Sequence, residues 1–303
     1  MRPRQAFSLA AVSGRRTGRR CVGTGCHLRL TITCARLTDV SMDKDDVDFG
    51  FREPQRPYDS GSQRARVWTE QWVADWLYCP NCANPRLSQF PANTPVADFF
   101  CAQCNDQFEL KSKQGTFGSK IANGAYAKKI ERLNSANNPN LMLMSYDSAS
   151  ARVKDITVIP KHFFAPSIIE ERPPLAPTAR RAGWVGSNIA IGRIPQAGRI
   201  ALVSDGVMVD RHVVVEQWNA TRFLRDQSLE GRGWLLDVLN CVEAFGSAEF
   251  TIDQMYNYVP ALSLKYPKNN NVRAKIRQQL QVLRDQGIIE FLGHGRYVRR
   301  WRA

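Results

Sequence analysis

The chain of 303 residues lacks several features that would place it in a common class of protein. No stretch approaches about 18 consecutive apolar residues, so we expect no segment that crosses a membrane. We find no secretory hydrophobic region, no internal repeat and no long low-complexity tract. The four His are scattered along the sequence, and none has metal-ligand spacing. These absences favour a globular protein of a reducing, cytoplasmic compartment.

Acidic residues are scarce relative to basic ones. The sequence has 28 Asp and Glu against 42 Lys and Arg, which gives a net charge of +14. Residues 1–41 hold eight Arg, no Lys and one Asp, and so carry +7 of that charge. A basic balance points to polyanions, nucleic acid first and an anionic membrane second. We expect residues 1–41 to be a disordered or mis-annotated N-terminal extension; an Arg-rich transit peptide and a flexible DNA-binding arm are the alternatives.

Eight Cys are present, but only four have organised spacing. They follow the pattern C-x2-C-x18-C-x2-C and are Cys79, Cys82, Cys101 and Cys104. Each pair can place two thiolates on one side of a tight turn, and both pairs together complete the tetrahedral sulfur shell that Zn²⁺ prefers. With four protein ligands, such a zinc ion is structural. The alternatives are two redox pairs or four buried cysteines, and the helix that a redox pair normally opens is missing here.

The periodicities of the chain indicate an α/β (α+β) architecture in two domains, at residues 42–226 and 227–303. Residues 59–78 are predicted as an amphipathic helix with a packing stripe at Trp68, Trp72 and Trp76. Residues 79–113 contain two short strands around the cysteines, and residues 120–160 alternate helix and strand in a mixed sheet. Residues 172–187 form a basic, Pro-rich loop.

Two acids and a lysine interleave with the cysteines. Asp98, Glu109 and Lys111 form the pattern D-x10-E-x-K. In an extended strand Glu109 and Lys111 project on one face, and a hairpin around the second Cys pair would bring Asp98 beside Glu109. Two carboxylates could then hold Mg²⁺ against a phosphodiester, while Lys111 orients the attacking water or helps to deprotonate it. Taken alone the pattern is weak, because E-x-K also occurs in ordinary surface ion pairs.

The C-terminal segment has the order of elements found in a winged helix. Helical periods over residues 233–245, 251–259 and 269–287 precede two short strands around a Gly-His-Gly turn. The third helix is expected to pack on the core through Val272, Ile276, Leu280 and Leu283. The opposite face, its flanks and the hairpin carry the candidate DNA contacts Asn270, Asn271, Lys275, Arg277, Gln278 and Arg296. A winged helix used for protein pairing is the alternative.

At these motifs the sequence resembles the DpnI family of methyl-directed restriction endonucleases, which cut G-methyladenine-T-C. The resemblance extends from about residue 63 to residue 299 and is carried by YCPNC, PVADFFC, FELKSK, NGAYA, PLAPTARRAGWVG and KIRQQLQVLRD. It implies a PD-(D/E)xK nuclease core with an embedded four-Cys zinc site, joined to a C-terminal winged helix. The sequence departs from the family in residues 1–41 and in a longer loop near residues 205–222.

The resemblance also implies roles for individual residues. Asp98 and Glu109 match the metal ligands of the family, and Lys111 matches its water-activating residue. Trp184 matches the aromatic residue that senses the adenine methyl groups. From the basic loop itself we expect Arg180 and Arg181 to neutralise nearby phosphates, with an ordinary solvated loop as the alternative. A Trp that covers the edge of the sheet is the alternative for Trp184.

We therefore predict a Mg²⁺-dependent endonuclease that hydrolyses double-stranded DNA at adenine-methylated GATC sites. It would act as a monomer or as a transient dimer on DNA. Two alternatives remain: a zinc-ribbon and winged-helix DNA-binding regulator without nuclease activity, and a repair nuclease of the same fold without methyl specificity.

Overall fold

A seven-stranded mixed sheet organises the first part of the protein in the computed structural model, which describes residues 61–91, 97–133, 135 and 138–300. Its strands are β1 (Ser88–Gln89), β2 (Phe99–Phe100), β3 (Gln107–Gln114), β5 (Asn140–Asp147), β6 (Arg152–Ile159), β9 (Ile200–Ser204) and β10 (Val207–Met208), in that spatial order. β3 and β5 run parallel, and all other neighbours are antiparallel. The predicted mixed sheet is confirmed, whereas the extension at residues 1–41 lies outside the described residues.

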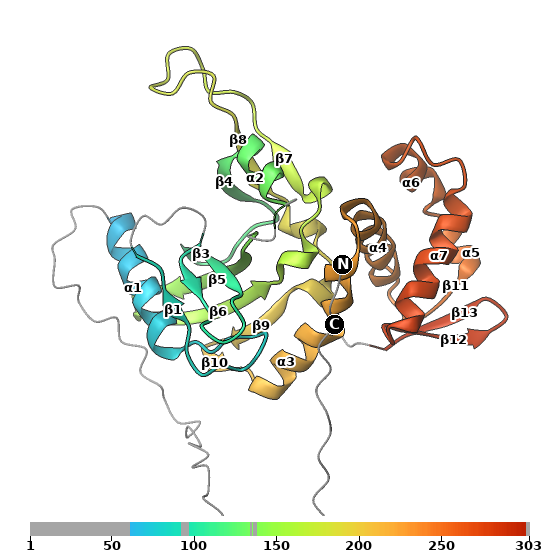
Figure 1. Ribbon diagram of the computed structural model, residues 1–303, viewed down its shortest axis with the longest axis horizontal. Coiled ribbons are helices and arrows are strands. Elements are labelled where there is room, and N and C mark those ends of the chain that lie inside the picture. Colours follow the sequence, from blue (N-terminus) through green and yellow to red (C-terminus); the bar gives the residue numbers. More distant parts are fainter. Residues whose placement is uncertain (1–60, 92–96, 134, 136–137, 301–303) are drawn as a thin grey trace, which may run out of the picture. The chain divides into compact units, whose positions relative to one another are not determined.

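Two helices pack on this sheet (Figure 1). α1 (Gly61–Trp76) contacts β3, which confirms the helix predicted from its periodicity. Only part of its aromatic stripe is buried: Trp72 is 4% exposed, but Trp76 is 41% exposed and faces away from the core. The second helix, α3 (Arg211–Ala220), contacts β9.

The prediction of a loop near residues 205–222 is wrong, because this segment forms β10 (Val207–Met208) and α3. Asp210 caps the helix by accepting hydrogen bonds from the backbone N–H groups of His212 and Val213. Val214 and Trp218 are fully buried one turn apart, so the helix has an apolar face that packs on the sheet. The β-branched run at its start obscured this periodicity in the sequence.

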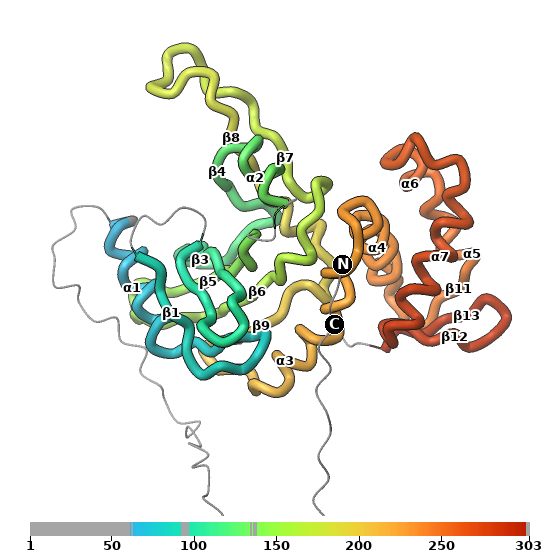
Figure 2. The backbone as a smooth tube through the Cα atoms, viewed as in Figure 1, coloured from blue at the N-terminus to red at the C-terminus, as the bar shows by residue number. Residues whose placement is uncertain are grey.

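A second, three-stranded sheet has the order β4-β8-β7, formed by β4 (Ile121–Ala125), β8 (Gly186–Ile189) and β7 (Ile169–Glu171). α2 (Tyr126–Leu133) follows β4 directly and contacts all three of these strands. Residues 172–185 leave β7, extend outward and return to β8 (Figure 2). The Pro-rich loop predicted here is confirmed, since none of these residues belongs to a helix or strand.

Short 3-10 helices occur between residues 161 and 226. They are η1 (Lys161–Phe163), η2 (Pro166–Ile168), η3 (Ile191–Arg193), η4 (Gln196–Gly198) and η5 (Arg222–Asp226). α4 (Leu229–Glu243) begins after η5 and packs against η1 and η2. Its last residue, Glu243, accepts hydrogen bonds from the backbone N–H groups of Gln196 and Ala197. The boundary at residues 226 and 227 stays a prediction.

The C-terminal elements are β11 (Glu249–Thr251), α5 (Ile252–Tyr256), α6 (Val259–Lys265), α7 (Val272–Asp285), β12 (Ile289–Gly293) and β13 (Arg296–Arg299). The three strands form a sheet in the order β11-β13-β12, and α7 packs on α4, α5 and α6. All four predicted core positions of α7 are buried. Two details of the prediction are wrong: residues 251–259 are split between α5 and α6, and Asn270 and Asn271 precede α7 instead of lying on it.

No helix in the described part of the chain has the length and hydropathy needed to cross a membrane.

Candidate active site and cysteine cluster

The four cysteines with organised spacing form a cluster that could hold a metal ion. The Sγ atoms of Cys79, Cys82, Cys101 and Cys104 all lie within 4.8 Å of one another. The Sγ–Sγ distance is 3.6 Å between Cys79 and Cys104 and 3.5 Å between Cys82 and Cys101. A tetrahedral ion with bonds of about 2.3 Å requires sulfur atoms about 3.8 Å apart, so the donor set fits zinc.

Both Cys pairs fold into the same tight turn. The backbone N–H of Ala83 donates to the carbonyl of Cys79, and that of Asn105 donates to the carbonyl of Cys101, each at 2.9 Å. Ala83 and Asn105 both have a φ of 60°. Burial raises the pKa of Cys101, but backbone N–H donors at Cys104 and Gln103 and the side chains of Cys82 and Asn84 together lower it to about 7. Among the described residues, no other group of three or more His, Cys, Asp or Glu side chains converges in this way.

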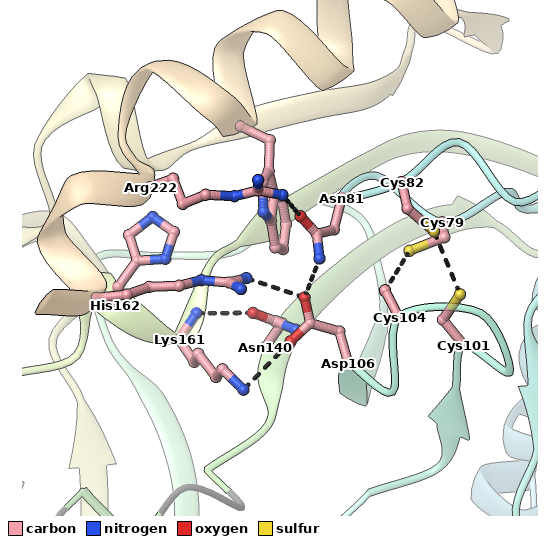
Figure 3. Close-up of polar contacts among 12 residues, drawn as sticks. Cys79, Asn81, Cys82, Cys101, Cys104, Asp106, Asn140, Lys161, His162 and Arg222 are labelled. Carbon is pink, nitrogen blue, oxygen red and sulfur yellow. Dashed lines mark hydrogen bonds and ion pairs between the residues drawn. The ribbon is translucent and has the colours of Figure 1, made fainter. Parts of the chain in front are cut away.

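A buried carboxylate links this cluster to distant parts of the chain (Figure 3). Asp106 follows the second turn and its side chain is 4% exposed. It accepts hydrogen bonds from Asn81 at 2.7 Å and Arg225 at 2.9 Å, and it forms an ion pair with Lys161 at 3.2 Å. Asn81 in turn accepts a hydrogen bond from Arg222 at 2.7 Å. The two Cys turns are thereby joined to η1 and η5.

The hairpin around the second Cys pair brings the predicted acids together. Phe99 of β2 pairs with Phe108 of β3, so Asp98 stands next to Glu109 in the antiparallel register. One oxygen of Asp98 accepts the backbone N–H of Leu110 at 2.8 Å, and the other lies 3.4 Å from Arg66. Glu109 Oε1 forms an ion pair with Lys111 Nζ at 2.8 Å.

These side chains line one cleft of about 540 Å³. Its walls come from α1, β3, β4 and α2, together with Ala97 and Asp98. Asp98 and Glu109 are 21% and 16% exposed, so the carboxylates remain accessible from the cleft. Two hard oxygen donors on neighbouring strands can hold a divalent cation such as Mg²⁺, and the same cleft can admit a phosphate group.

One cleft residue, Lys129, was not singled out in the sequence analysis. Lys129 of α2 is buried, and its Nζ lies 3.6 Å from Glu109 Oε2. Burial alone would raise the pKa of Glu109, but Lys111 and Lys129 together hold it below its ordinary value. Glu70, a second acid on the wall of the cleft, is 15% exposed and lies between Arg66 and Gln89. The helical spacing of Tyr126, Lys129 and Leu133 could have marked Lys129 as inward-facing.

The loop that carries Trp184 is exposed, but the indole itself is half-buried. The guanidinium of Arg181 lies 4.7 Å from the ring centroid. The indole also packs against Gly186, where an added Cβ would lie 2.8 Å from the ring. Arg180 and Arg181 are exposed. A contact with DNA would therefore use the uncovered part of the indole.

The candidate DNA contacts of the C-terminal elements are mostly at the surface. Lys275 donates to Gln278 at 2.9 Å, and Arg277 donates to the hydroxyl of Tyr256 at 3.0 Å. Arg296 forms an ion pair with Glu249 at 3.2 Å. Asn270 and Asn271 lie before the first turn of α7. The structure thus places the six candidates at the start of α7, along it and on the hairpin.

Two family models match the chain. The DpnI model, described as the Dam-replacing family, matches residues 51–227, which is more than half of the chain. A second model, described as the Dam-replacing HTH domain, matches residues 230–299.

Proposed function

The chain belongs to the Dam-replacing family; from this premise we propose that it is a restriction endonuclease that hydrolyses double-stranded DNA at adenine-methylated GATC sites with Mg²⁺. The observation that carries the proposal is the cleft in which Asp98, Glu109 and Lys111 come together from two paired strands. An E-x-K pattern that occurred by chance on a surface strand would not be expected to lie opposite a second carboxylate in a hairpin.

The proposed chemistry is that of a PD-(D/E)xK nuclease. Asp98 and Glu109 would hold Mg²⁺, which would supply charge stabilisation at the phosphate and a more acidic water. Asp98 is well placed for this role because the Leu110 N–H fixes one of its oxygens. Lys111, which is 33% exposed at the cleft, orients the attacking water or takes up its proton.

Zinc at the four cysteines has a structural role in this proposal. All four sulfur ligands come from the protein, so no position is left for a water or a substrate. Bound zinc would fix both Cys turns, and the second of them joins the strand after Asp98 to β3. It therefore supports the catalytic hairpin without taking part in the reaction.

Two separate regions would contact DNA. Trp184 would meet the adenine methyl groups in the major groove, and Arg180 and Arg181 the neighbouring phosphates. The winged helix at residues 227–303 would add the contacts of α7 and its hairpin, next to the catalytic domain at residues 42–226. Because the described residues form one such cleft, a monomer would cut the two strands in turn or two chains would pair transiently.

Variants of the cleft test the proposed nuclease. The full chain is incubated with Mg²⁺ and a plasmid that carries methylated GATC sites. We expect discrete fragments from the wild type and at least about a 100-fold loss of cleavage for Asp98→Asn and Lys111→Met. Lys154→Met, which changes an exposed lysine on β6 outside the cleft, should cut at the wild-type rate. A wild type that binds DNA but never cuts it would instead be a DNA-binding regulator.

A further inference from the structure

Lys129 is the most deeply buried cation of the cleft. Its side chain is 8% exposed, although α2 presents the adjacent Lys128 to solvent. A lysine rarely loses this much hydration without a specific partner, because burial of an ammonium group costs several kcal/mol. Its position therefore indicates a defined task within the cleft.

Two contacts fix the ammonium group. Nζ lies 3.6 Å from Glu109 Oε2 and 5.3 Å from the centroid of the Phe164 ring. The other oxygen of Glu109 faces Lys111. Each carboxylate oxygen thus has one ammonium partner, but the two lysines differ, since Lys111 is 33% exposed and Lys129 only 8%.

We propose that Lys129 is a positioning residue that holds Glu109 in its ligand orientation, so that Lys111 can leave Glu109 and act on the substrate. The inference rests on the proposed nuclease function. The partly buried carboxylate of Glu109 needs one permanent counter-charge, and the more deeply buried Lys129 supplies it. Lys111, at the open side of the cleft, is then available for the water and the phosphate.

The positive charge of Lys129 should lower the affinity of the cleft for a divalent metal ion. A fixed cation beside Glu109 repels the divalent ion that Glu109 binds. Removal of Lys129 also lets Glu109 turn, but it takes a full positive charge away from the metal site. The charge effect dominates binding, so metal binding should tighten, while the misplaced Glu109 slows cleavage. For a unit charge and a divalent ion about 6 Å apart, the effect on affinity is about tenfold even at the dielectric constant of water. If Lys129 had only a packing role, its removal would not raise the metal affinity and lower the cleavage rate at the same time.

The test uses the full chain with its cysteine site saturated with zinc. Mn²⁺ binding without DNA is measured by the electron paramagnetic resonance of the free ion, and cleavage is measured at saturating Mg²⁺. For Lys129→Met we expect Mn²⁺ affinity at least about tenfold higher and cleavage about tenfold slower. Lys129→Arg should restore much of the rate, and Lys154→Met is the matched lysine control. Should Lys129→Met fail to fold, Lys129→Gln gives the same comparison.

The outcomes separate this inference from the proposed function. If Lys129→Met binds Mn²⁺ as the wild type does, or more weakly, or cuts at an unchanged rate, the positioning role is wrong. Glu109→Gln should lose both Mn²⁺ binding and cleavage. If the wild type neither binds Mn²⁺ nor cuts DNA, the nuclease proposal itself fails, and the role of Lys129 fails with it.

Discussion

The buried carboxylate of Asp106 offers the sharpest prediction about stability. Asp106→Ala would leave Lys161 and Arg225 without this partner, and the Asn81 amide without its acceptor. Both cations are 27% exposed, so water can replace only part of what they lose. The substitution would also detach the second Cys turn from η1 and η5.

Removal of one partner from a buried ion pair costs about 3–5 kcal/mol. Because the two cations are partly hydrated, we expect the lower end, about 3 kcal/mol. In a domain of this size, 1 kcal/mol shifts the midpoint of thermal unfolding by about 2–4 °C. Asp106→Ala should therefore lower the Tm by about 6–12 °C.

Circular dichroism of the zinc-loaded chain measures this shift. The matched control is Asp285→Ala, which breaks the exposed pair with Arg284, and should change stability by less than about 1 kcal/mol. After zinc is removed with a chelator, the effect of Asp106→Ala should shrink, since the turn that Asp106 anchors is then no longer held. A Tm equal to that of the wild type would refute the idea that this network stabilises the fold.

Three further predictions concern other sites. Burial holds the pKa of His162 well below its ordinary value, so the unfolded chain takes up the proton first as the pH falls. The free energy of unfolding should therefore decrease below about pH 6.5, by up to about 1.4 kcal/mol per pH unit. Urea titrations at several pH values should find this slope reduced in His162→Gln and kept in the exposed His212→Gln. Cys101→Ser should lower zinc content, measured by atomic absorption, and reduce the Tm more than Cys241→Ser, which changes a buried cysteine outside the cluster. Trp184→Ala should lessen the preference for methylated over unmethylated DNA in binding assays and leave zinc content unchanged; an unaltered preference would assign Trp184 a packing role.

Local patterns predicted the parts of the site that depend on local geometry. The spacing of the cysteines determines two short turns, and the second turn places Asp98 opposite Glu109 through a hairpin. The helical periods of α1 and α7 follow from their apolar positions in the same way. Such features involve residues that are near one another in the sequence.

Contacts between distant segments could not be predicted in this way. The hydrogen bond from Arg222 to Asn81 joins residues 141 positions apart, and no periodicity relates them. Lys129 reaches Glu109 only because β3 pairs with β5 in parallel and α2 lies between them in sequence. The helix α3 was missed because its cap at Asp210 and its buried Trp218 outweigh the strand preference of three consecutive Val residues.

The central claim is tested most directly with one plasmid prepared with and without adenine methylation at GATC. Each form is incubated with the full chain in Mg²⁺ or in EDTA. We predict discrete fragments from the methylated plasmid in Mg²⁺ and from no other combination. Equal cutting of both plasmids would contradict methyl specificity, and no cutting of either, with DNA binding retained, would contradict the assignment of a nuclease.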